Sequence, residues 1–378
     1  MKLIQAVSGK PLILKQRELE FSFYPMVRSN RRWGIHSTLY ATDPWAVIAG
    51  AVTESITAPA ERKAADSFVR QAHEYFAAAE RANNIETRPL LYYYSFMNLA
   101  KAIAMGRGRA GLVGKVTHGV AHVGGAGQSH APTAAQLQIG ASSTTSKTVI
   151  DELHHALEGA PVSTGQYKVS EIIAQSAIAH RVWREAFPQP RIERFIPVDR
   201  VEFIHDDASK KVWLRVLVSR AVLKSRGWGL KKMLQQSGLG ADFRAVKNPD
   251  GVVEAEFHTL EQLVPKQYTG RAADVVVDVV EVVRPFLWQT ITASSPFRRF
   301  YLYLSPQGER RMPQWLSVYA TFFWLGSLTR YQPVELFEAL DGKFGPFFRE
   351  FLETQPRQLL YLLASDAKKQ DVTRGVIV

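Results

Sequence analysis

The chain has 378 residues, of which 46% are hydrophobic and 22% are charged, and it carries a formal net charge of +12 at pH 7. This balance is typical of a folded globular protein with one large domain or two smaller ones, and it argues against long disordered segments. The sequence contains no cysteine, which excludes disulfides, thiolate-bound zinc, iron–sulfur clusters and cysteine nucleophiles.

Two features of the sequence predict a cytoplasmic protein without a membrane segment. Residues 1–10 become polar too early to hold the apolar core of a signal peptide. The most apolar late run, 315–328, is shorter than the roughly 20 residues that a membrane-spanning helix needs, and it carries Ser317, Thr321 and Ser327. The lack of cysteine also suits a reducing compartment.

The N-terminal half is predicted to be an irregular segment followed by a helical region. Prolines divide residues 1–58, which we expect to form short strands and loops. In the helical region, 59–190, apolar residues recur every three or four positions over 60–83, and nearly every position is apolar over 88–105. The second of these helices should therefore be packed on several sides.

A glycine-rich loop is predicted at 106–148, inside the helical region. It contains nine of the 25 glycines and lies within a stretch, 87–150, that has no Asp or Glu. Loops of this length are commonly functional or mobile. Further helices are predicted at 150–158 and 168–187.

The rest of the chain is predicted to contain a small antiparallel sheet and a closing set of helices. In the segment 191–265, two runs with a two-residue period, 198–205 and 212–220, flank a turn, and a second hairpin surrounds the turn signal at 248–251. The segment 266–378 is predicted to be helical, with helices at 272–292, 313–329, 333–353 and 356–366 and a strand at 300–304. The predicted fold class is α+β, mainly α, with helical N- and C-terminal parts around the sheet.

One glycine motif, from Gly106 to Gly111, matches the G-x-G-x-x-G pattern of dinucleotide-binding folds. In those folds the glycines follow a strand and open a helix. Here they follow a predicted helix, and no acidic residue lies about 20 positions further on. We therefore interpret the motif as the end of a helix that leads into a basic loop, and we expect no cofactor.

Histidines are concentrated in and after the loop, since five of the ten lie between residues 118 and 155. His118 and His122 have the spacing of two metal ligands on a helix. Glycines surround them, however, and no acid follows them in the sequence until Asp151 and Glu152. A polar loop is the preferred interpretation, and no metal site is predicted.

Some helical RNases use an arginine and a histidine a few residues apart, in which the arginine binds the scissile phosphate and the histidine transfers a proton. Arg31 and His36 have this spacing, as do Arg200 and His205, but neither pair lies on a predicted helix. Whether the protein is an enzyme therefore stays open. The catalytic candidates for an RNase are His118 and His122 with Arg107 and Arg109.

The positive net charge favours an anionic partner such as RNA or DNA. The acid-free stretch supplies all of the basic residues that we expect to contact phosphates. The predicted phosphate contacts are Arg88, Lys101, Arg107, Arg109 and Lys115.

Three stretches of the sequence together resemble a known family. They are 88–102 (RPLLYYYSFMNLAKA), 325–333 (LGSLTRYQP) and 356–365 (PRQLLYLLAS), and the pair His118-Gly119 follows the first. This pattern resembles the YaaC-like family of bacterial proteins. The resemblance implies a soluble bacterial protein and one family spanning most of the chain, but no reaction and no catalytic residues. The first stretch is also similar, more distantly, to helices of the HEPN class, which often serve RNA cleavage or defence systems.

These features lead to three hypotheses about function. The preferred one is a nucleic-acid-contacting or regulatory binding subunit, which the HEPN resemblance would place in a bacterial defence complex. One alternative is a HEPN-like RNase. The other is a structural subunit whose aromatic-rich C-terminal helices bind a protein partner or a second copy of the chain.

Overall fold

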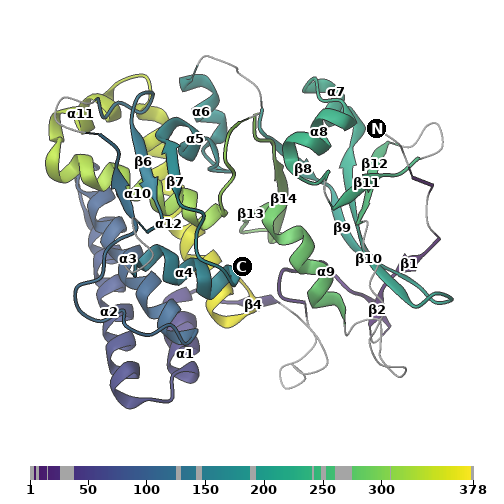
Figure 1. Ribbon diagram of the computed structural model, residues 1–378, viewed down its shortest axis with the longest axis horizontal. Helices are drawn as coiled ribbons and strands as arrows, with labels where there is room; N and C mark the ends of the chain where they lie inside the picture. Colours follow the sequence, from purple (N-terminus) through teal and green to yellow (C-terminus); the bar gives the residue numbers. More distant parts are fainter. Residues whose placement is uncertain are drawn as a thin grey trace. The chain divides into compact units, whose positions relative to one another are not determined.

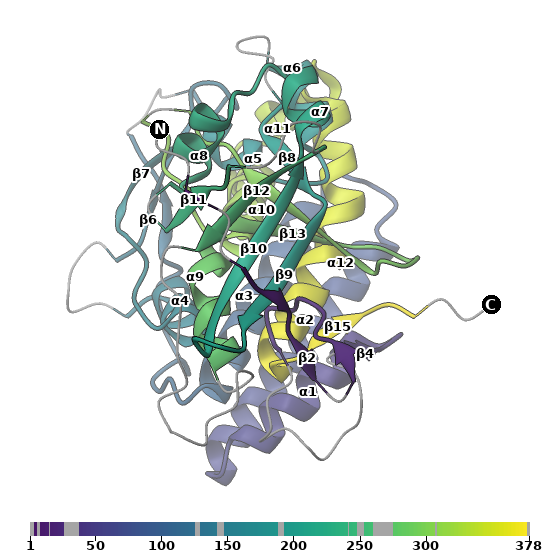
Figure 2. The same cartoon turned by 90° about the vertical axis from the view of Figure 1, so that its right-hand side faces the viewer.

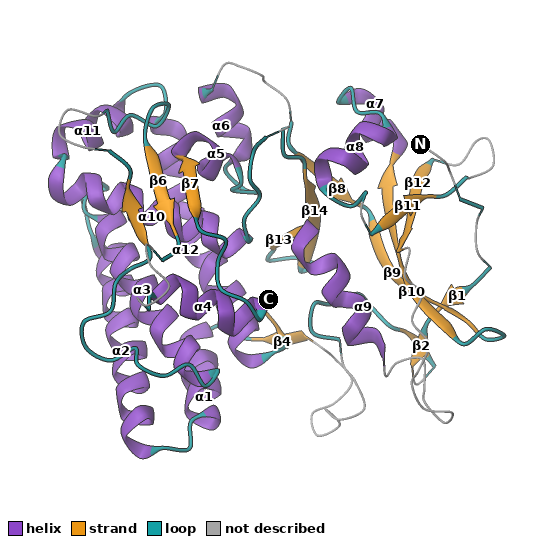
Figure 3. Cartoon of the chain, viewed as in Figure 1, coloured by secondary structure: helices purple, strands orange, loops and turns teal. Residues whose placement is uncertain are grey.

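The computed structural model describes residues 4–5, 8–14, 16–25, 38–124, 129–141, 147–187, 193–240, 242–247, 253–259, 275–306 and 308–375. Two compact units make up the chain, and each is assembled from stretches that are far apart in the sequence (Figure 1). The first unit comprises Met1–Tyr40, Ile192–Glu309 and Thr373–Val378, and the second comprises Ala41–Arg191 and Arg310–Val372. Most strands belong to the first unit and most helices to the second, which gives the predicted α+β, mainly α fold (Figure 3).

The second unit is built mainly of helices. They are α1 (Pro44–Ser55), α2 (Pro59–Arg81), α3 (Arg88–Gly106), α4 (Val149–Glu158), α5 (Val169–Ala174), α6 (His180–Ala186), α10 (Gln314–Tyr331), α11 (Pro333–Asp341) and α12 (Gly345–Lys368). α2, α3 and α4 confirm the helices predicted at those positions. α1 lies within the segment expected to be irregular, and Asp43 caps it by accepting a hydrogen bond of 2.9 Å from the backbone N–H of Trp45.

α3 is the central helix of this unit, with α2 and α10 packed against it. Phe96 stacks on Phe322 of α10 with ring centroids 5.5 Å apart, and it meets Phe76 of α2 edge to face at 6.1 Å. The buried hydroxyl of Ser95 donates a 2.7 Å hydrogen bond to the carbonyl oxygen of Ala72. Side chains on α3 are therefore carried by a well-supported backbone, as the apolar sequence of this helix predicts.

A three-stranded antiparallel sheet also belongs to the second unit. Its strands, in spatial order, are β5 (Val120–His122), β6 (Gln136–Ile139) and β7 (Gly165–Lys168). Two of them lie in the segment predicted to be a glycine-rich loop. The sheet forms there because Leu137 and Ile139 alternate with glutamines, so both apolar side chains face inward and are fully buried.

The C-terminal helices divide at a different place from the one predicted. A single helix was expected over 333–353 and a break before Pro356, but the break lies between α11 and α12 and Pro356 lies inside α12. A Cβ at Gly345 would lie 2.1 Å from the carbonyl oxygen of Leu340, so only glycine allows the chain to turn this tightly. Buried residues on both sides of Pro356 hold α12 together despite the missing N–H.

The first unit contains a five-stranded antiparallel sheet, in which β9 and β10 are long neighbouring strands (Figure 2). The strands in spatial order are β1 (Lys10–Pro11), β9 (Arg200–Asp206), β10 (Lys211–Ser219), β12 (Glu254–Thr259) and β11 (Phe243–Ala245). The β9/β10 and β11/β12 pairs confirm the two predicted hairpins, and the turn at 248–251 lies outside the described residues. Val212, Leu214, Val216 and Val218 face the core from alternate positions of β10.

Only part of the helix predicted at 272–292 is helical. α9 (Val276–Val283) is followed by one turn of 3-10 helix and then by β13 (Leu287–Ile291), and 272–274 lie outside the described residues. Pro285 cannot continue the helix, and the five residues of β13 that follow the 3-10 turn are all buried. β13 pairs with β14 (Arg298–Tyr303), which in turn pairs with β8 (Phe195–Val198).

The remaining described elements are short. They are β2 (Ile13–Leu14), β3 (Arg17–Glu18), β4 (Thr38–Tyr40), α7 (Arg220–Ser225), α8 (Leu230–Ser237) and β15 (Asp371–Thr373). α8 ends at Gly238, which has the left-handed conformation common after the last turn of a helix.

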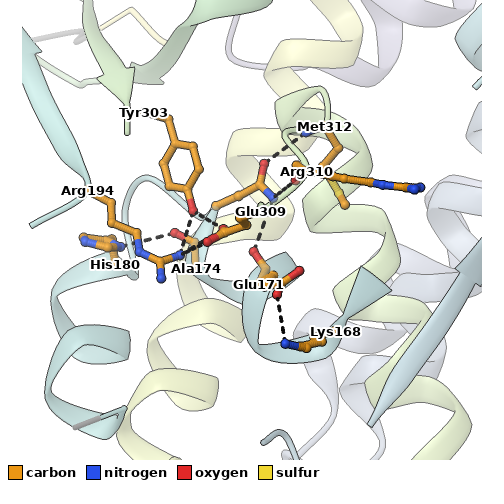
Figure 4. Close-up of polar contacts among 10 residues, drawn as sticks. Lys168, Glu171, Ala174, His180, Arg194, Tyr303, Glu309, Arg310 and Met312 are labelled. Atoms are coloured by element: carbon orange, nitrogen blue, oxygen red, sulfur yellow. Dashed lines mark hydrogen bonds and ion pairs between the residues drawn. The ribbon is translucent and has the colours of Figure 1, made fainter. Parts of the chain in front are cut away.

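A buried ion pair joins the two ends of the first unit's middle stretch, Ile192–Glu309 (Figure 4). Arg194 donates to both carboxylate oxygens of Glu309 at 2.9 and 2.8 Å, and the hydroxyl of Tyr303 donates to the same carboxylate at 2.7 Å. In the second unit, the amide side chain of Gln175 bonds the backbone of Arg310 and Met312 at 3.2 and 3.1 Å. The chain is thus fixed on each side of the Glu309–Arg310 bond. Gln175 also stands where the helix predicted at 168–187 stops, between α5 and α6.

Candidate functional site

One face of α3 carries a tyrosine pair and a lysine instead of aliphatic side chains. Tyr93, Met97 and Lys101 follow one another at intervals of four residues, and Tyr94 lies seven positions before Lys101, so these side chains share a face. Tyr93 and Lys101 are buried, whereas Tyr94 is half-buried. This face is where the chain returns after the helix, at residues 117–122.

The backbone around His118 is held in a fixed position. The N–H of Val149 donates to the carbonyl of Thr117 at 2.9 Å, and the N–H of Gly140 donates to the carbonyl of Gly119 at 2.9 Å. Gly119 has φ +85°, and a Cβ there would lie 2.4 Å from the hydroxyl oxygen of Thr148. Only glycine meets both conditions, so the His118-Gly119 pair places the imidazole at one defined point.

His118 forms a hydrogen bond with Tyr93. The bond joins the Tyr93 hydroxyl to Nδ1, and the two rings have centroids 5.7 Å apart. Burial raises the pKa of Tyr93 well above its usual value, so the hydroxyl keeps its proton and can donate to Nδ1. A neutral imidazole that accepts at Nδ1 carries its own proton on Nε2.

Tyr319 of α10 lies next to this pair, with its ring 5.8 Å from that of Tyr93. Its hydroxyl is fully buried and faces the hydroxyl of Tyr93. Burial is the main reason that the pKa of Tyr319 is raised, and the charge of Tyr93 and a hydrogen bond with it add to the effect.

Two cations act on His118. Its pKa is lowered first by burial and then by the positive charges of Arg330 and Lys101. Arg330, at the end of α10, is exposed and donates to the hydroxyl of Tyr94. Lys101 lies 5.1 Å from the ring centroid of Phe68, and burial lowers its pKa. Within the described part of the chain neither cation has a carboxylate partner, so the site is electropositive.

The second loop histidine lies on β5, on the same side of the chain as His118. His122 contacts the ring of Phe323 at 5.7 Å and that of His130 at 5.0 Å. Burial and the charge of His130 lower the pKa of His122 to about 4. The backbone N–H of His130 donates to Glu335 at 3.1 Å. No group of three His, Asp or Glu side chains that could hold a metal ion occurs among the residues that the structure describes.

Comparison with protein families gives one match. The model of the YaaC-like protein family matches residues 36–367, which include the whole site described above. The chain belongs to the YaaC-like family. The match supports the YaaC-like resemblance and gives no support to the HEPN resemblance. No curated protein and no solved structure matches the chain. None of the described helices has the length and apolar character needed to cross a bilayer.

In this YaaC-like chain, most of the predicted phosphate contacts are engaged in internal bonds. Arg88 forms an ion pair of 2.6 Å with Glu353, and Arg109 forms one of 2.6 Å with Glu152. Arg107 donates to the carbonyl of Asp366. Lys115 is exposed and has no ion-pair partner in the described ranges, while Lys101 lies at the His118 site.

The catalytic candidates are only partly brought together. His118 and His122 lie at the site, but the charges that act on His118 come from Arg330 and Lys101 and not from Arg107 or Arg109. Arg31 and His36 lie outside the described residues. Arg200 and His205 lie on β9, and Arg200 pairs there with Glu202 and Glu254 at 3.1 Å.

The glycine motif is the end of α3, as predicted. The N–H of Gly108 donates to the carbonyl of Met105 at 2.9 Å, and Gly108 has φ +78°. The glycines therefore terminate a helix and do not open one, which is incompatible with a dinucleotide fold.

Sequence reasoning did not select Arg330, Tyr93 or Tyr319 for the site. Arg330 is more than 200 positions from His118 in the sequence, so no local pattern links them. The available signal was the family resemblance: the first two stretches that carry it contain Tyr93, Tyr94, Lys101 and Arg330, and His118-Gly119 follows the first. These positions meet in the folded second unit.

The arrangement supports two kinds of chemistry. The two cations can attract and hold an anion beside His118. When Nδ1 accepts from Tyr93, the neutral imidazole offers Nε2–H as a hydrogen-bond donor to the anion; in the other tautomer Nδ1–H donates to the Tyr93 oxygen and Nε2 can accept a proton. Both depend on the same fixed His118-Gly119 turn.

Proposed function

We propose that this YaaC-like protein binds nucleic acid and that Arg330, Lys101 and His118 form its phosphate-contacting site. The observation that carries the proposal is the pair of cations beside His118 without a carboxylate partner in the described residues. An anion that enters this site gains charge-assisted hydrogen bonds without breaking an internal ion pair. The net charge of +12 favours a polyanion over a small neutral ligand.

The proposal shifts the phosphate contacts away from most of those predicted from the sequence. Arg88 and Arg109 would have to give up ion pairs with Glu353 and Glu152 before they could bind phosphate. Arg330 and Lys115 are exposed and carry no such cost. We therefore keep Lys101 and Lys115 from the original set and add Arg330.

The test measures binding of labelled RNA and DNA by fluorescence anisotropy across a series of salt concentrations. The affinity should fall linearly with salt on logarithmic axes, and Arg330→Gln should both weaken binding and reduce the slope by about 0.7–0.9. Lys63→Gln is the matched control, because Lys63 is another exposed cation without an ion pair in the described residues, on α2. No binding at low salt, or equal losses in both variants, would overturn the proposal.

A second candidate function is cleavage of the bound RNA. It is favoured by the neutral imidazole of His118, which Tyr93 orients next to two cations that can stabilise a charged transition state. Incubation of the purified protein with single-stranded and structured RNA tests this candidate. Cleavage should disappear in His118→Ala and persist in Arg107→Gln and Arg109→Gln. Cleavage that His118→Ala leaves unchanged would exclude it.

A further inference from the structure

Three tyrosines from separate elements of the second unit form a row with Arg330. The guanidinium of Arg330 lies 4.6 Å from the ring centroid of Tyr331 and 5.8 Å from that of Tyr94. Tyr94 in turn lies 5.6 Å from Tyr75 of α2, with the two ring planes tilted by 30°. Tyr331 is 66% exposed and Tyr75 is 37% exposed, so the two ends of the row face solvent.

The row has properties that a stabilising aromatic cluster does not need. The ring of Tyr331 is 66% exposed and therefore contributes little to the apolar core. Hydrogen bonds from Arg330 to the hydroxyls of Tyr94 and Tyr331 hold the guanidinium between the rings. The row therefore presents flat π-faces and a fixed positive charge side by side.

This combination matches the chemistry of an unpaired nucleotide strand. Aromatic rings stack on bases whatever their identity, and an adjacent cation neutralises the phosphate that links them. The bases of a duplex already stack on one another and do not offer their faces to a protein. An acidic peptide would satisfy Arg330 but would leave the exposed rings without partners.

We propose that the row Tyr75–Tyr94–Arg330–Tyr331 is a stacking platform for single-stranded nucleic acid. The proposal rests on the proposed function and narrows it to one class of ligand. A base stacks on Tyr331, the neighbouring phosphate binds Arg330, and the strand continues over Tyr94 toward Tyr75. Tyr93, the partner of His118, contacts Tyr94 of this row with ring centroids 5.4 Å apart.

The experiment compares labelled single strands of about 16 nucleotides with duplexes of the same length at one low salt concentration. The full chain is used, with three variants: Tyr331→Ala, Tyr331→Phe and Phe337→Ala. Tyr331→Phe keeps the ring and loses only the hydroxyl. Phe337 is a matched control, because it is 56% exposed on α11 and has no contact with Arg330 among the described residues.

Single strands should bind more tightly than duplexes. Tyr331→Ala should weaken single-strand binding by at least roughly 5-fold, the loss of one base stack, whereas Tyr331→Phe and Phe337→Ala should change it less than about 2-fold. Equal affinity for duplexes and single strands together with an unaffected Tyr331→Ala variant would overturn this inference and leave the proposed function standing. A loss in Phe337→Ala as large as that in Tyr331→Ala would overturn it too, because general apolar adhesion would then explain binding. Absence of binding to either form would remove the proposed function and this inference together.

Discussion

The Arg194–Tyr303–Glu309 cluster of the first unit and the Tyr93–His118 site of the second both combine buried tyrosines with charged groups, but they differ in charge balance. In the first cluster the guanidinium meets a carboxylate, and the tyrosine hydroxyl donates to the same carboxylate. At the second site two cations act on a neutral imidazole and have no carboxylate partner among the described residues. The internal pairing of the first cluster suits a structural role, whereas the second site keeps its capacity for an external anion.

Glu309→Ala tests the structural role of the first cluster and has the largest expected effect. The substitution leaves Arg194 buried without its carboxylate, so we expect the free energy of unfolding to fall by about 3–5 kcal/mol. Chemical denaturation of the two proteins measures the difference. Asp341→Ala is the control, because it removes the partner of Arg349 from an exposed pair and should lower stability by less than about 1 kcal/mol. Similar losses in the free energy of unfolding in both variants would show that the buried cluster stabilises the fold no more than an exposed ion pair does.

Gly119→Ala tests whether the His118 turn of the second site is rigid. A Cβ at φ +85° meets the hydroxyl of Thr148 at 2.4 Å, so the His118 turn must shift, and we expect a loss of about 2–4 kcal/mol. Gly108→Ala has a similar φ of +78° with nothing within 4 Å of the new Cβ, and it should lower stability by only about 1 kcal/mol. Thermal or urea unfolding separates the two, and nucleic-acid affinity should fall only in Gly119→Ala. Equal effects would mean that the turn is not rigid.

The smallest expected effect is the pH dependence that His122 contributes. Its pKa is about 4 in the folded protein and near 6.5 in the unfolded chain, so unfolding takes up a proton between these values. The resulting stability is complete above pH 6.5 and is lost as the pH falls toward about 4. Urea unfolding at several pH values should therefore show a weaker decline below pH 6.5 in His122→Gln than in the natural protein. Superimposable pH profiles would contradict this assignment.

The parts of the fold that the sequence predicts are those with a strong local pattern. α2 has apolar residues at helical spacing, α3 is apolar at nearly every position, and β9 and β10 are apolar runs on either side of a turn, so each pattern can be recognised without knowledge of the partner. β6 has only four residues among glycines, and such a short alternation cannot be separated from loop sequence. β13 directly follows a valine-rich helix, and only Pro285 marks the boundary.

The site was harder to predict because its members come from distant stretches. The acid-free stretch contains Lys101 and His118, which the fold brings together, but it also pointed to Arg109, which folding pairs with Glu152. That pairing depends on α4 packing beside α3, which no spacing in the sequence encodes. Arg330 differs from the other arginines of the three family stretches in having no carboxylate partner in the described fold, and this difference is visible only after the helices have packed.

The division of each unit over separated stretches has a consequence for synthesis on the ribosome. α3 emerges long before α10, so the apolar face that α10 covers must wait for the C-terminal third of the polypeptide, whereas the contacts that hold the His118 turn come from residues 140–149. Before α10 is made, the ribosome synthesises the long middle stretch of the first unit, Ile192–Glu309, which carries most of that unit's strands. Fragments that end before α10 should therefore expose α3 and depend on chaperones, and the proposed phosphate-contacting site can only be completed once Arg330 has been synthesised, in the last stage of translation.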